Sequence, residues 1–304
     1  MSLKSRREFL FLYTVKDANP NGDPLNENHP RFDEDTMQAM ASDVRIKRTI
    51  RDEFIRQRKN VLIDAEPKSL KQRLDELKQA LGKDNAKDVI KECIDTRLFG
   101  VTFALGKEAF AWTGPVQFKW ARSLHAATFT FIQGASAFAT ESRDNQAKQQ
   151  RSFRNEYKVP FALMSVYGIA NQYPSIETGA TDQDVDEMLD ALWKGTDNLI
   201  TRSKTEHKSR FLLEIVYKEG FDGKIAALDE KISIVAPDGH RFDKDEEKSL
   251  RSLSEFLVDV TPLTEAILNH AGVIENVKVI RDPEIRLKGD DDLKKFAKLT
   301  LEMR

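Results

Sequence analysis

Residues 9–54 constrain the fold most, because three kinds of local structure follow one another there. An apolar run at residues 9–15 has the density of Phe, Leu and Val that is typical of a strand. The loop after it reads N-P-N-G-D-P, in which Pro fixes φ while Asn and Gly tolerate positive φ. A helix follows from residue 42 to 51, with Ser42 in the position of its N-cap. The order is therefore strand, tight loop, helix.

This predicted helix has an apolar face and a cationic face. The apolar positions are four residues apart: Ile46, Ile50 and Phe54. The basic positions lie on the other side: Arg45, Lys47, Arg48 and Arg51. Cations in the first turn oppose the positive end of the helix dipole, and a bound anion would remove that cost. The alternative is a solvated face on which Arg48 pairs with Asp52 one turn later, and both interpretations stay open here.

Length and composition limit the class of protein. A chain of 304 residues can bury a full core, and its net charge of -2 means that nucleic acid would be held by local clusters of cations. The single cysteine, Cys93, excludes an internal disulfide and a cysteine metal cluster, and fits a reducing compartment. We expect a cytoplasmic protein without a membrane span, since there is no long apolar run and no cleavable leader.

The dependable elements run strand, helix, strand, strand, helix, strand. This is the split βαβ order of a ferredoxin-like, RRM-like sheet, so we expect an α+β protein that forms a single domain over residues 1–304. The second helix is the clearest, because Thr181 caps it with Asp184 at N3. We expect Gly195 to end this helix.

Three segments lie outside that frame. Residues 59–120 form an insertion with two small amphipathic helices, the first closed by Gly82, followed by strands and turns from residue 95. Residues 134–157 are too polar to bury, and both a protruding hairpin and a mobile loop fit them. Residues 219–304 add a helix through Leu250, Leu253 and Leu257 and a charged terminal helix.

Most catalytic and metal-binding patterns are missing from the sequence. The five histidines show no ligand spacing, and no glycine precedes a Lys-Ser or Lys-Thr pair as in a phosphate-binding loop, so we predict no metal and no cofactor. The acidic runs are typical of solvated surface. Asp23 and Asp33 are the exception, because a carboxylate beside a bound RNA phosphate could assist attack by a 2′-hydroxyl.

Basic residues recur at loop ends around the predicted sheet, and this recurrence indicates contacts with phosphates. Each alone is ordinary surface in the simplest interpretation. The set is Arg45, Lys47, Arg48, Arg97, Lys119, Arg143, Arg151, Arg202 and Lys204. Phe138 and Phe153 either pack the polar segment onto the body or stack against bases, where each stack is worth roughly 1–3 kcal/mol.

With these residues in view, the sequence resembles the repeating backbone subunit of Cascade, the CRISPR type I effector, of the I-B/I-C kind. The matching motifs are N-P-N-G-D-P, P-R-x-D, D-V-R-I-K-R-T-I-R-D, G-P-V-Q-F, V-P-F-A-L, A-L-W-K-G-T and T-R-S-K. They stand in order between about residue 8 and residue 217. The resemblance implies an RRM-like palm with a helical finger insertion (59–120), a thumb hairpin (134–157) and a C-terminal extension packed on the palm (219–304).

The resemblance also implies a function. It suggests a protein that is not an enzyme but binds CRISPR guide RNA, stacks head to tail with copies of itself, contacts other Cascade subunits and supports pairing of the guide with target DNA. The implied RNA-binding residues are Asn19, Asn21, Arg31, Arg45, Lys47, Arg48, Gln117, Arg143, Arg151, Arg202 and Lys204. Phe138 and Phe153 are the implied candidates for wedging bases apart. The alternative is a metal-dependent endoribonuclease of a type III-like effector, using Asp23 or Asp33.

Overall fold

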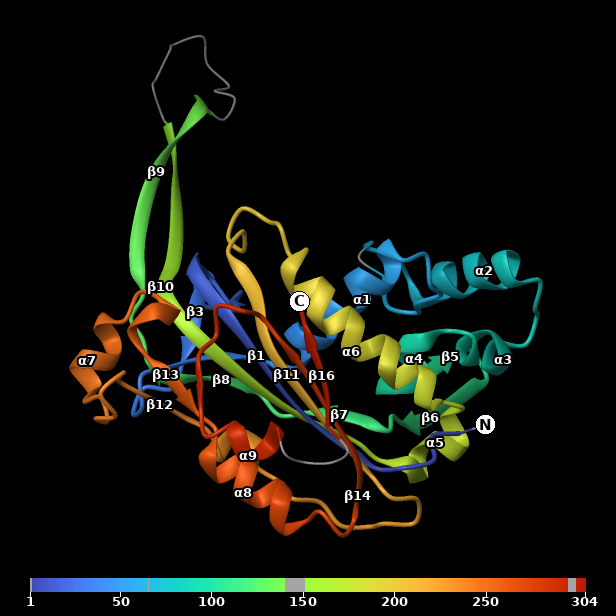
Figure 1. The fold of residues 1–304 in the computed structure, drawn as a ribbon. Coiled ribbons are helices and arrows are strands. Elements are labelled where there is room, and N and C mark those ends of the chain that lie inside the picture. The colour runs from blue at the N-terminus through green and yellow to red at the C-terminus, as the bar shows by residue number, and fades with distance from the viewer. Residues whose placement is uncertain (1, 65, 140–150, 295–298) are drawn as a thin grey trace.

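The computed structural model describes residues 2–64, 66–139, 151–294 and 299–304, and within them the fold is α+β around a large mixed sheet (Figure 1). Four long strands form the middle of this sheet in the order β14 (Ile274–Arg281), β11 (His207–Tyr217), β1 (Arg7–Ala18) and β10 (Arg151–Ala170). Within this group of four, adjacent strands are antiparallel. The apolar run at residues 9–15 is thus the centre of the sheet.

Shorter strands extend this sheet on both sides. Beyond β14 lies β16 (Leu299–Met303), which is parallel to it. Beyond β10 follow β8 (Ala121–Ala126), β4 (Gln38–Ala41), β3 (His29–Phe32) and β2 (Gly22–Asp23), while β7 (Val116–Phe118) and β9 (Thr130–Ala139) pair with opposite ends of β10. Strand β10 therefore joins the body of the sheet to the structures at both of its ends.

Both faces of the central sheet are buried. Side chains alternate along β1, so successive residues pack on opposite faces. Phe9, Phe11 and Tyr13 pack on the face covered by α1 (Asp43–Arg56) and α6 (Asp182–Asp197). Leu10 and Leu12 pack on the opposite face, against the C-terminal part of the chain. The sequence reads as a continuous apolar run here because neither face of the strand meets water.

Helix α1 follows the predicted pattern. The Ser42 side chain accepts a hydrogen bond from the backbone N–H of Arg45, which confirms it as the N-cap. Ile46, Ile50 and Phe54 are buried against the sheet and confirm the apolar face. Of the cationic positions, Arg45, Lys47 and Arg48 are partly exposed, whereas Arg51 is buried.

Helix α6 begins as predicted and ends later. Thr181 and Asp184 form the expected capping box. The prediction that Gly195 ends the helix is wrong, because α6 continues to Asp197. A Cβ at Gly195 would lie 2.8 Å from the Thr49 carbonyl oxygen and 3.0 Å from Glu53 Cβ, so this glycine permits the close approach of α6 to α1.

The segment 59–120 has a hydrophobic cluster of its own. Its elements are α2 (Leu70–Leu81), α3 (Ala86–Lys91), α4 (Ile94–Phe99), β5 (Gly100–Leu105) and β6 (Glu108–Thr113), of which α2, α3, β5 and β6 surround the cluster. Gly82 ends α2 in the left-handed conformation, as predicted. The expectation of strand from residue 95 is wrong for α4, where the buried Asp95 carboxylate binds Arg51 and the backbone N–H groups of Leu62 and Ile63.

The described part of residues 134–157 is a two-stranded hairpin. Strand β9 pairs with the first half of β10, from Thr130 opposite Lys158 to Ala139 opposite Arg151. The hairpin projects from the body of the molecule (Figure 1). Arg143 lies outside the described residues.

The C-terminal part covers the second face of the sheet. Its elements are η1 (Leu228–Glu230), β12 (Ser233–Val235), α7 (Lys244–Ser249), η2 (Leu253–Glu255), β13 (Leu257–Asp259), α8 (Thr261–Asn269), β15 (Leu287–Lys288) and α9 (Asp291–Lys294). The short helix α5 (Gln172–Thr178) does not belong to this part and lies on the other side of the molecule (Figure 1). The predicted helix through Leu257 is wrong, because α7 ends at Ser249 and Leu257 begins a strand. The predicted terminal helix is also wrong for residues 299–303, which pair with β14 as β16.

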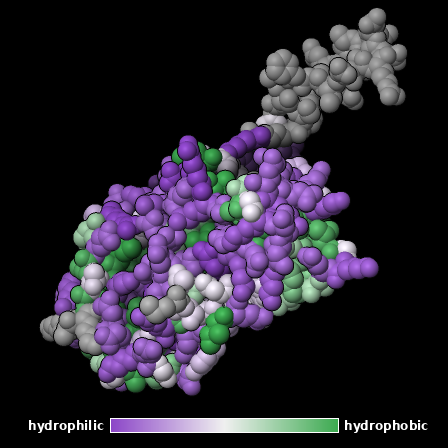
Figure 2. All heavy atoms as spheres, turned by 90° about the vertical axis from the view of Figure 1, so that its right-hand side faces the viewer, coloured by the Kyte–Doolittle hydropathy of each residue, from purple (hydrophilic) through white to green (hydrophobic). Residues whose placement is uncertain are grey.

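One face of the molecule is mostly polar (Figure 2). The face that carries α2, α3 and α5 is largely hydrophilic, with hydrophobic side chains gathered in separate patches (Figure 2). No helix among the described residues is both long enough and apolar enough to cross a bilayer.

Candidate nucleic-acid interface

A cleft of about 450 Å³ lies beside the stem of the β9–β10 hairpin. Its walls come from the loop after β1, the first turn of α1, the hairpin stem and the loop before β11. The lining residues are Asn19, Asn21, Gly22, Glu27, Asn28, Arg45, Asn155, Glu156, Tyr157, Arg202, Ser203 and Lys204. Five of the residues that the sequence predicted for RNA binding therefore meet here: Asn19, Asn21, Arg45, Arg202 and Lys204.

Backbone hydrogen bonds hold the two loops of the cleft together. The N–H of Asn19 donates to the carbonyl oxygen of Ser203 at 2.7 Å, and the N–H of Lys16 donates to that of Glu206 at 3.0 Å. The loop 201–206 is thus an extension of the β1–β11 pairing. This explains how Arg202 and Lys204 come to lie near Arg45, which precedes them by more than 150 residues in the sequence.

The two loop asparagines shape the cleft. Asn21 Oδ1 accepts from the backbone N–H of Ser42 at 2.9 Å and from its hydroxyl at 3.0 Å, which ties the loop to the N-cap of α1. Asn19 Nδ2 donates to the carbonyl oxygen of Asn28 at 2.8 Å. Both side chains therefore have intramolecular partners, and they fix the position of the wall that carries Arg45.

Positive charge gathers in the cleft without full compensation. Lys204 is half-buried and has no ion pair among the described residues. Burial, together with the nearby charge of Arg45, lowers the pKa of Lys204 to about 8. Burial also lowers the pKa of Arg45, whose guanidinium donates to Thr49 Oγ1 at 3.0 Å and stands 3.9 Å from Asp52. An anion placed between these cations would relieve their mutual repulsion.

The positive charge of the cleft also affects the pKa of His207, a buried residue. Its pKa is lowered to about 3 by burial, with Lys204 and Arg45 contributing. Its ring stacks on Tyr13 with centroids 5.9 Å apart. Since the imidazole stays neutral, the cleft's positive charge comes from the lysine and arginines. Two carboxylates, Glu27 and Glu156, also line the cleft, and Glu156 lies 3.8 Å from Lys158.

The other cations of α1 are engaged elsewhere. Lys47 pairs with Asp43 at 3.1 Å and lies 5.7 Å from the ring centroid of Phe99. Arg48 pairs with Asp52, as the alternative interpretation of the helix had it, and donates to the Asp64 carbonyl oxygen at 2.9 Å. Neither residue lines the cleft. Of the predicted helix contacts, the structure brings Arg45 alone to the other cleft residues.

The remaining predicted contacts lie apart from the cleft. Arg31 pairs with Asp23 at 3.1 Å and belongs to a neighbouring cavity. Gln117 is opposite Ile169 on β10, which is roughly 40 Å along an extended strand from Tyr157 in the cleft. Arg151 is opposite Ala139, towards the outer end of the hairpin. The backbones of Phe138 and Phe153 lie on β9 and β10.

The two candidate catalytic carboxylates are held by arginines. Asp33 accepts from Arg122 at 2.6 Å and from the backbone N–H of Thr36 at 3.0 Å, and the Arg122 hydrogen bond is the largest cause lowering its pKa to about 2. Asp23 accepts from Arg31. No group of three or more potential ligands suited to a metal ion occurs in the described parts of the chain.

The hairpin stem forms a wall of the cleft that the sequence did not predict. Asn155 and Tyr157 line it, and the ring of Tyr157 lies 3.7 Å from that of His29, centroid to centroid. The available signal was position, because both residues directly precede the V-P-F-A-L strand that pairs with β1.

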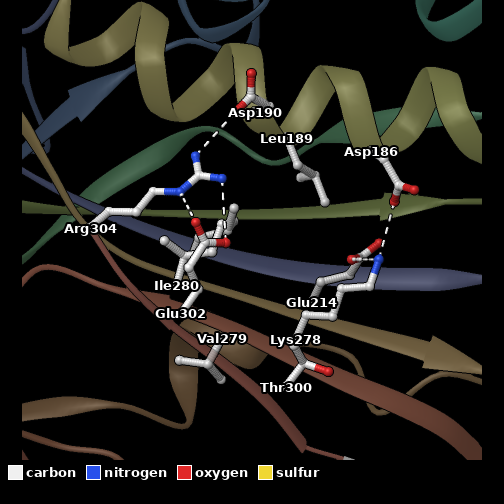
Figure 3. A pocket seen from close by; sticks show the side chains of 11 residues that line it. Asp186, Leu189, Asp190, Glu214, Lys278, Val279, Ile280, Thr300, Glu302 and Arg304 are labelled. Carbon is white, nitrogen blue, oxygen red and sulfur yellow. Dashed lines mark hydrogen bonds and ion pairs between the residues drawn. The ribbon is translucent and has the colours of Figure 1, made fainter.

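A pocket between α6 and the β14–β16 edge provides a contrast (Figure 3). Its charged side chains are Asp186, Asp190, Glu214, Glu302, Lys278 and Arg304. Arg304 pairs with Asp190 and Glu302, and Lys278 pairs with Asp186 and Glu214. Carboxylates outnumber cations and every cation is paired, so this pocket is unsuited to phosphate.

Comparison with known proteins finds one matching family. The family model described as CRISPR-associated protein Cas7 matches residues 5–261. A CRISPR-associated protein Cas7 from Haloferax volcanii is 26% identical over 324 aligned residues, covering 97% of this chain and 92% of the relative.

Solved structures share the fold. A chain of a "CRISPR RNA-guided surveillance complex, pre-nicking" superposes with a TM-score of 0.54 at 13% identity, covering 95% of this chain and 98% of that one. A chain of a "CRISPR RNA-guided surveillance complex" gives 0.52 at 15% identity, covering 97% and 94%. At these identities the likeness concerns the fold alone.

Proposed function

The chain belongs to the CRISPR-associated Cas7 family, and from this premise we propose that it is a non-catalytic backbone subunit of a CRISPR RNA-guided surveillance complex. The observation that carries the binding role is the meeting of Arg45, Arg202 and Lys204 in one cleft. These cations grip the phosphates of a guide RNA without reading its bases. Such a grip suits a protein that must hold any guide sequence and leaves recognition of the target to base pairing.

The architecture supports an RRM-like palm as the framework of this site. The strands β11, β1, β10 and β8 are adjacent in that order, α1 lies between β1 and β8 in the chain, and α6 lies between β10 and β11. That is the βαββαβ arrangement of the ferredoxin-like fold. In this proposal residues 59–120 are the finger, residues 134–157 the thumb, and residues 219–304 the extension packed on the palm.

The same proposal assigns partners. The subunit stacks head to tail with further copies along the guide, contacts other Cascade subunits, and supports target DNA paired to the guide, in a cytoplasmic complex of the I-B/I-C kind. Stacking of this sort requires a heterologous interface, in which two different surfaces of the chain meet. The motif set between the first strand and T-R-S-K supports the subtype.

The candidate RNA contacts differ in whether their side chains already lie in the cleft or are held in ion pairs elsewhere. Arg45, Arg202 and Lys204 are placed to bind phosphate directly, and Asn19 and Asn21 act by shaping the cleft. Contacts by Lys47, Arg48 or Arg31 would first require the loss of an ion pair. Gln117, Arg143 and Arg151 are proposed on the resemblance, as are the base-wedging roles of Phe138 and Phe153.

The salt dependence of RNA binding tests this function. For roughly four phosphates held per subunit, the logarithm of the association constant should fall with the logarithm of salt concentration at a slope of about −2.8. The double variant Arg45→Ala/Lys204→Ala removes two contacts and should reduce this slope by about 1.4 units, because each single-strand phosphate contributes about 0.7. Fluorescence anisotropy with labelled single-stranded RNA gives both values.

A matched variant controls for the loss of charge alone. Lys71→Ala/Lys87→Ala removes two exposed cations from the 59–120 segment and should leave the slope unchanged. A slope near zero for the wild-type protein would contradict the proposed function. RNA incubated with the protein and Mg²⁺ should stay intact, whereas regular cleavage that disappears in Asp23→Ala or Asp33→Ala would support the ribonuclease alternative instead.

A further inference from the structure

A second cavity, of about 400 Å³, is lined by the same β2–β3 ribbon that lines the cationic cleft. We call it the aromatic cavity. Its lining includes His29, Arg31, Phe32, Trp120 and Phe129. Its volume lies within the range of roughly 300–1,000 Å³ that is usual for small-molecule pockets. It is therefore large enough for a single planar ring system.

The aromatic rings of this cavity are unusually exposed. Trp120 is 42% exposed and Phe129 is 39% exposed. Phe129 has ring contacts with His29 at 5.3 Å and with Phe32 at 5.6 Å between centroids. The Arg31 guanidinium lies over Trp120, 5.9 Å from the ring centroid, and is held by Asp23. Exposed apolar side chains that lie together, as these rings do, often mark a site for a ligand or partner.

One ring pair connects the aromatic cavity to the cationic cleft. Tyr157 lines the cleft, His29 lines the aromatic cavity, and their ring centroids are 3.7 Å apart. A strand whose phosphates lie beside Arg45 and Lys204 therefore passes next to an aromatic surface. Sites for single-stranded nucleic acid commonly combine these two parts, a cationic groove for the backbone and rings on which bases stack.

Polar groups at the cavity match the edge of a base. Asp23 and Glu34 supply carboxylate acceptors, Asn26 supplies an amide, and Arg31 supplies donors. The surface of a protein partner would need a larger, flatter apolar area than this concave site. The combination of exposed rings, hydrogen-bonding groups and continuity with the cleft favours a nucleobase as the occupant.

Resting on the proposed function, we infer that the aromatic cavity receives a nucleobase of the bound RNA and stacks it against Trp120 and Phe129. This base contact is separate from the phosphate contacts of Arg45 and Lys204. It adds affinity that does not depend on salt, because stacking releases no counterions. It also tolerates any base, since every base has a π-face.

Tryptophan fluorescence reports directly on this cavity. Trp112 and Trp193 are each only 4% exposed, so Trp120 is the accessible tryptophan of the three. Adding single-stranded RNA to the RNA-free full-length chain should quench the emission of Trp120. Trp120→Phe keeps an aromatic ring in place and should retain affinity while losing the RNA-dependent quenching. Unchanged emission of the wild-type protein at saturating RNA would contradict the inference.

Affinity measurements separate stacking from phosphate binding. Trp120→Ala and Phe129→Ala should each weaken binding of mixed-sequence RNA by roughly 5- to 140-fold, the range given by the loss of one base stack. The salt slope should stay at the wild-type value. On an abasic RNA of the same length, which keeps the phosphates but lacks bases, the variants and the wild type should bind equally.

Two controls make the outcomes distinguishable. Tyr173→Ala removes an exposed ring from α5, at a distance from the hairpin, and should bind RNA as the wild type does (Figure 1). If the wild type binds RNA with the expected salt slope but Trp120→Ala binds equally well, the aromatic cavity is not a base site and the proposed function stands. If Trp120→Ala prevents only self-assembly, seen by light scattering, the cavity is a contact between copies and the inference is overturned.

Discussion

At the scale of single residues, the structure divides a set of cations that look equivalent in the sequence. Arg45, Lys47 and Arg48 stand within four positions, yet Lys47 and Arg48 are neutralised by Asp43 and Asp52. Arg45 stands farther from Asp52, at 3.9 Å, and lines the cleft together with Lys204. The difference follows from helix geometry. Lys47 and Arg48 each have an acidic residue four positions away on the same side of the helix, whereas Arg45 is directed towards the loop before β11.

The burial of Lys204, together with the nearby charge of Arg45, should make RNA binding depend on pH. The pKa of Lys204 in the folded protein, about 8, is below its ordinary value of 10.5. Its charged form thus costs stability below pH 8, and that cost is relieved as pH rises towards 10.5. Phosphate binding needs the charged form, so affinity should fall by up to about tenfold between pH 7 and pH 9.

The variant Lys204→Arg provides the control for this prediction. Arginine keeps its charge over the whole range, so the affinity of the variant should change much less between pH 7 and pH 9. Anisotropy titrations at constant ionic strength measure both proteins. An equal fall in the two proteins would show that another group controls the pH dependence.

At the scale of elements, the contact between α1 and α6 sets the geometry of the cleft. Helix α1 carries Arg45, and α6 leads into the loop that carries Arg202 and Lys204. The two helices approach closely at Gly195, where α6 meets the backbone of α1 at Thr49. Gly195, which the sequence predicted to end the helix, therefore permits the packing of α6 on α1.

Replacing Gly195 tests this contact. Alanine is the better helix former by about 1 kcal/mol, so helix propensity alone predicts a gain in stability for Gly195→Ala. The clash of its Cβ with the Thr49 carbonyl oxygen, at 2.8 Å, should outweigh that gain, because overpacking typically costs about 1–3 kcal/mol. We expect a lower free energy of unfolding in urea and weaker RNA binding.

Gly272→Ala is the matched control, because a Cβ there would have no heavy atom within 4 Å. Its free energy of unfolding should stay within about 0.5 kcal/mol of the wild type. A Gly195→Ala protein that is as stable as the wild type would mean that α6 can move away from α1 without cost.

At the scale of the whole molecule, three hydrophobic clusters differ in how they are enclosed. The central strands lie between two of them, with α1 and α6 on one face and the C-terminal part on the other. The third lies in the 59–120 segment, around the two-stranded β5–β6 sheet. The cleft residues lie in segments connected directly to the central strands, so the site is held by the best-enclosed part of the fold.

Hydrogen exchange should reveal this hierarchy. Amides of residues 9–15 are paired on both sides, with β10 and with β11, and should exchange only on global unfolding. Amides of β5 and β6 have a partner on one side and should exchange through local opening at a lower free energy. Mass spectrometry across a urea series measures both. Equal protection of the two regions would show that the protein unfolds as one unit.

Elements whose signals are local could be predicted from the sequence. The Ser42 cap, the stripe of Ile46, Ile50 and Phe54, and the capping box of Thr181 and Asp184 each depend on neighbours within one or two turns, and the structure confirms them. The motif pattern also indicated the family to which the chain belongs.

Which residues meet depends on the folding of distant segments onto one another. It extended α6 past Gly195, turned residues 299–303 into a strand, and separated Arg45 from Lys47 and Arg48. It also brought Tyr157 against His29, and so joined the aromatic cavity to the cationic cleft. The physical reason is that caps and periodicity act along the chain, whereas close approach, strand pairing and charge compensation depend on segments that fold together from distant positions.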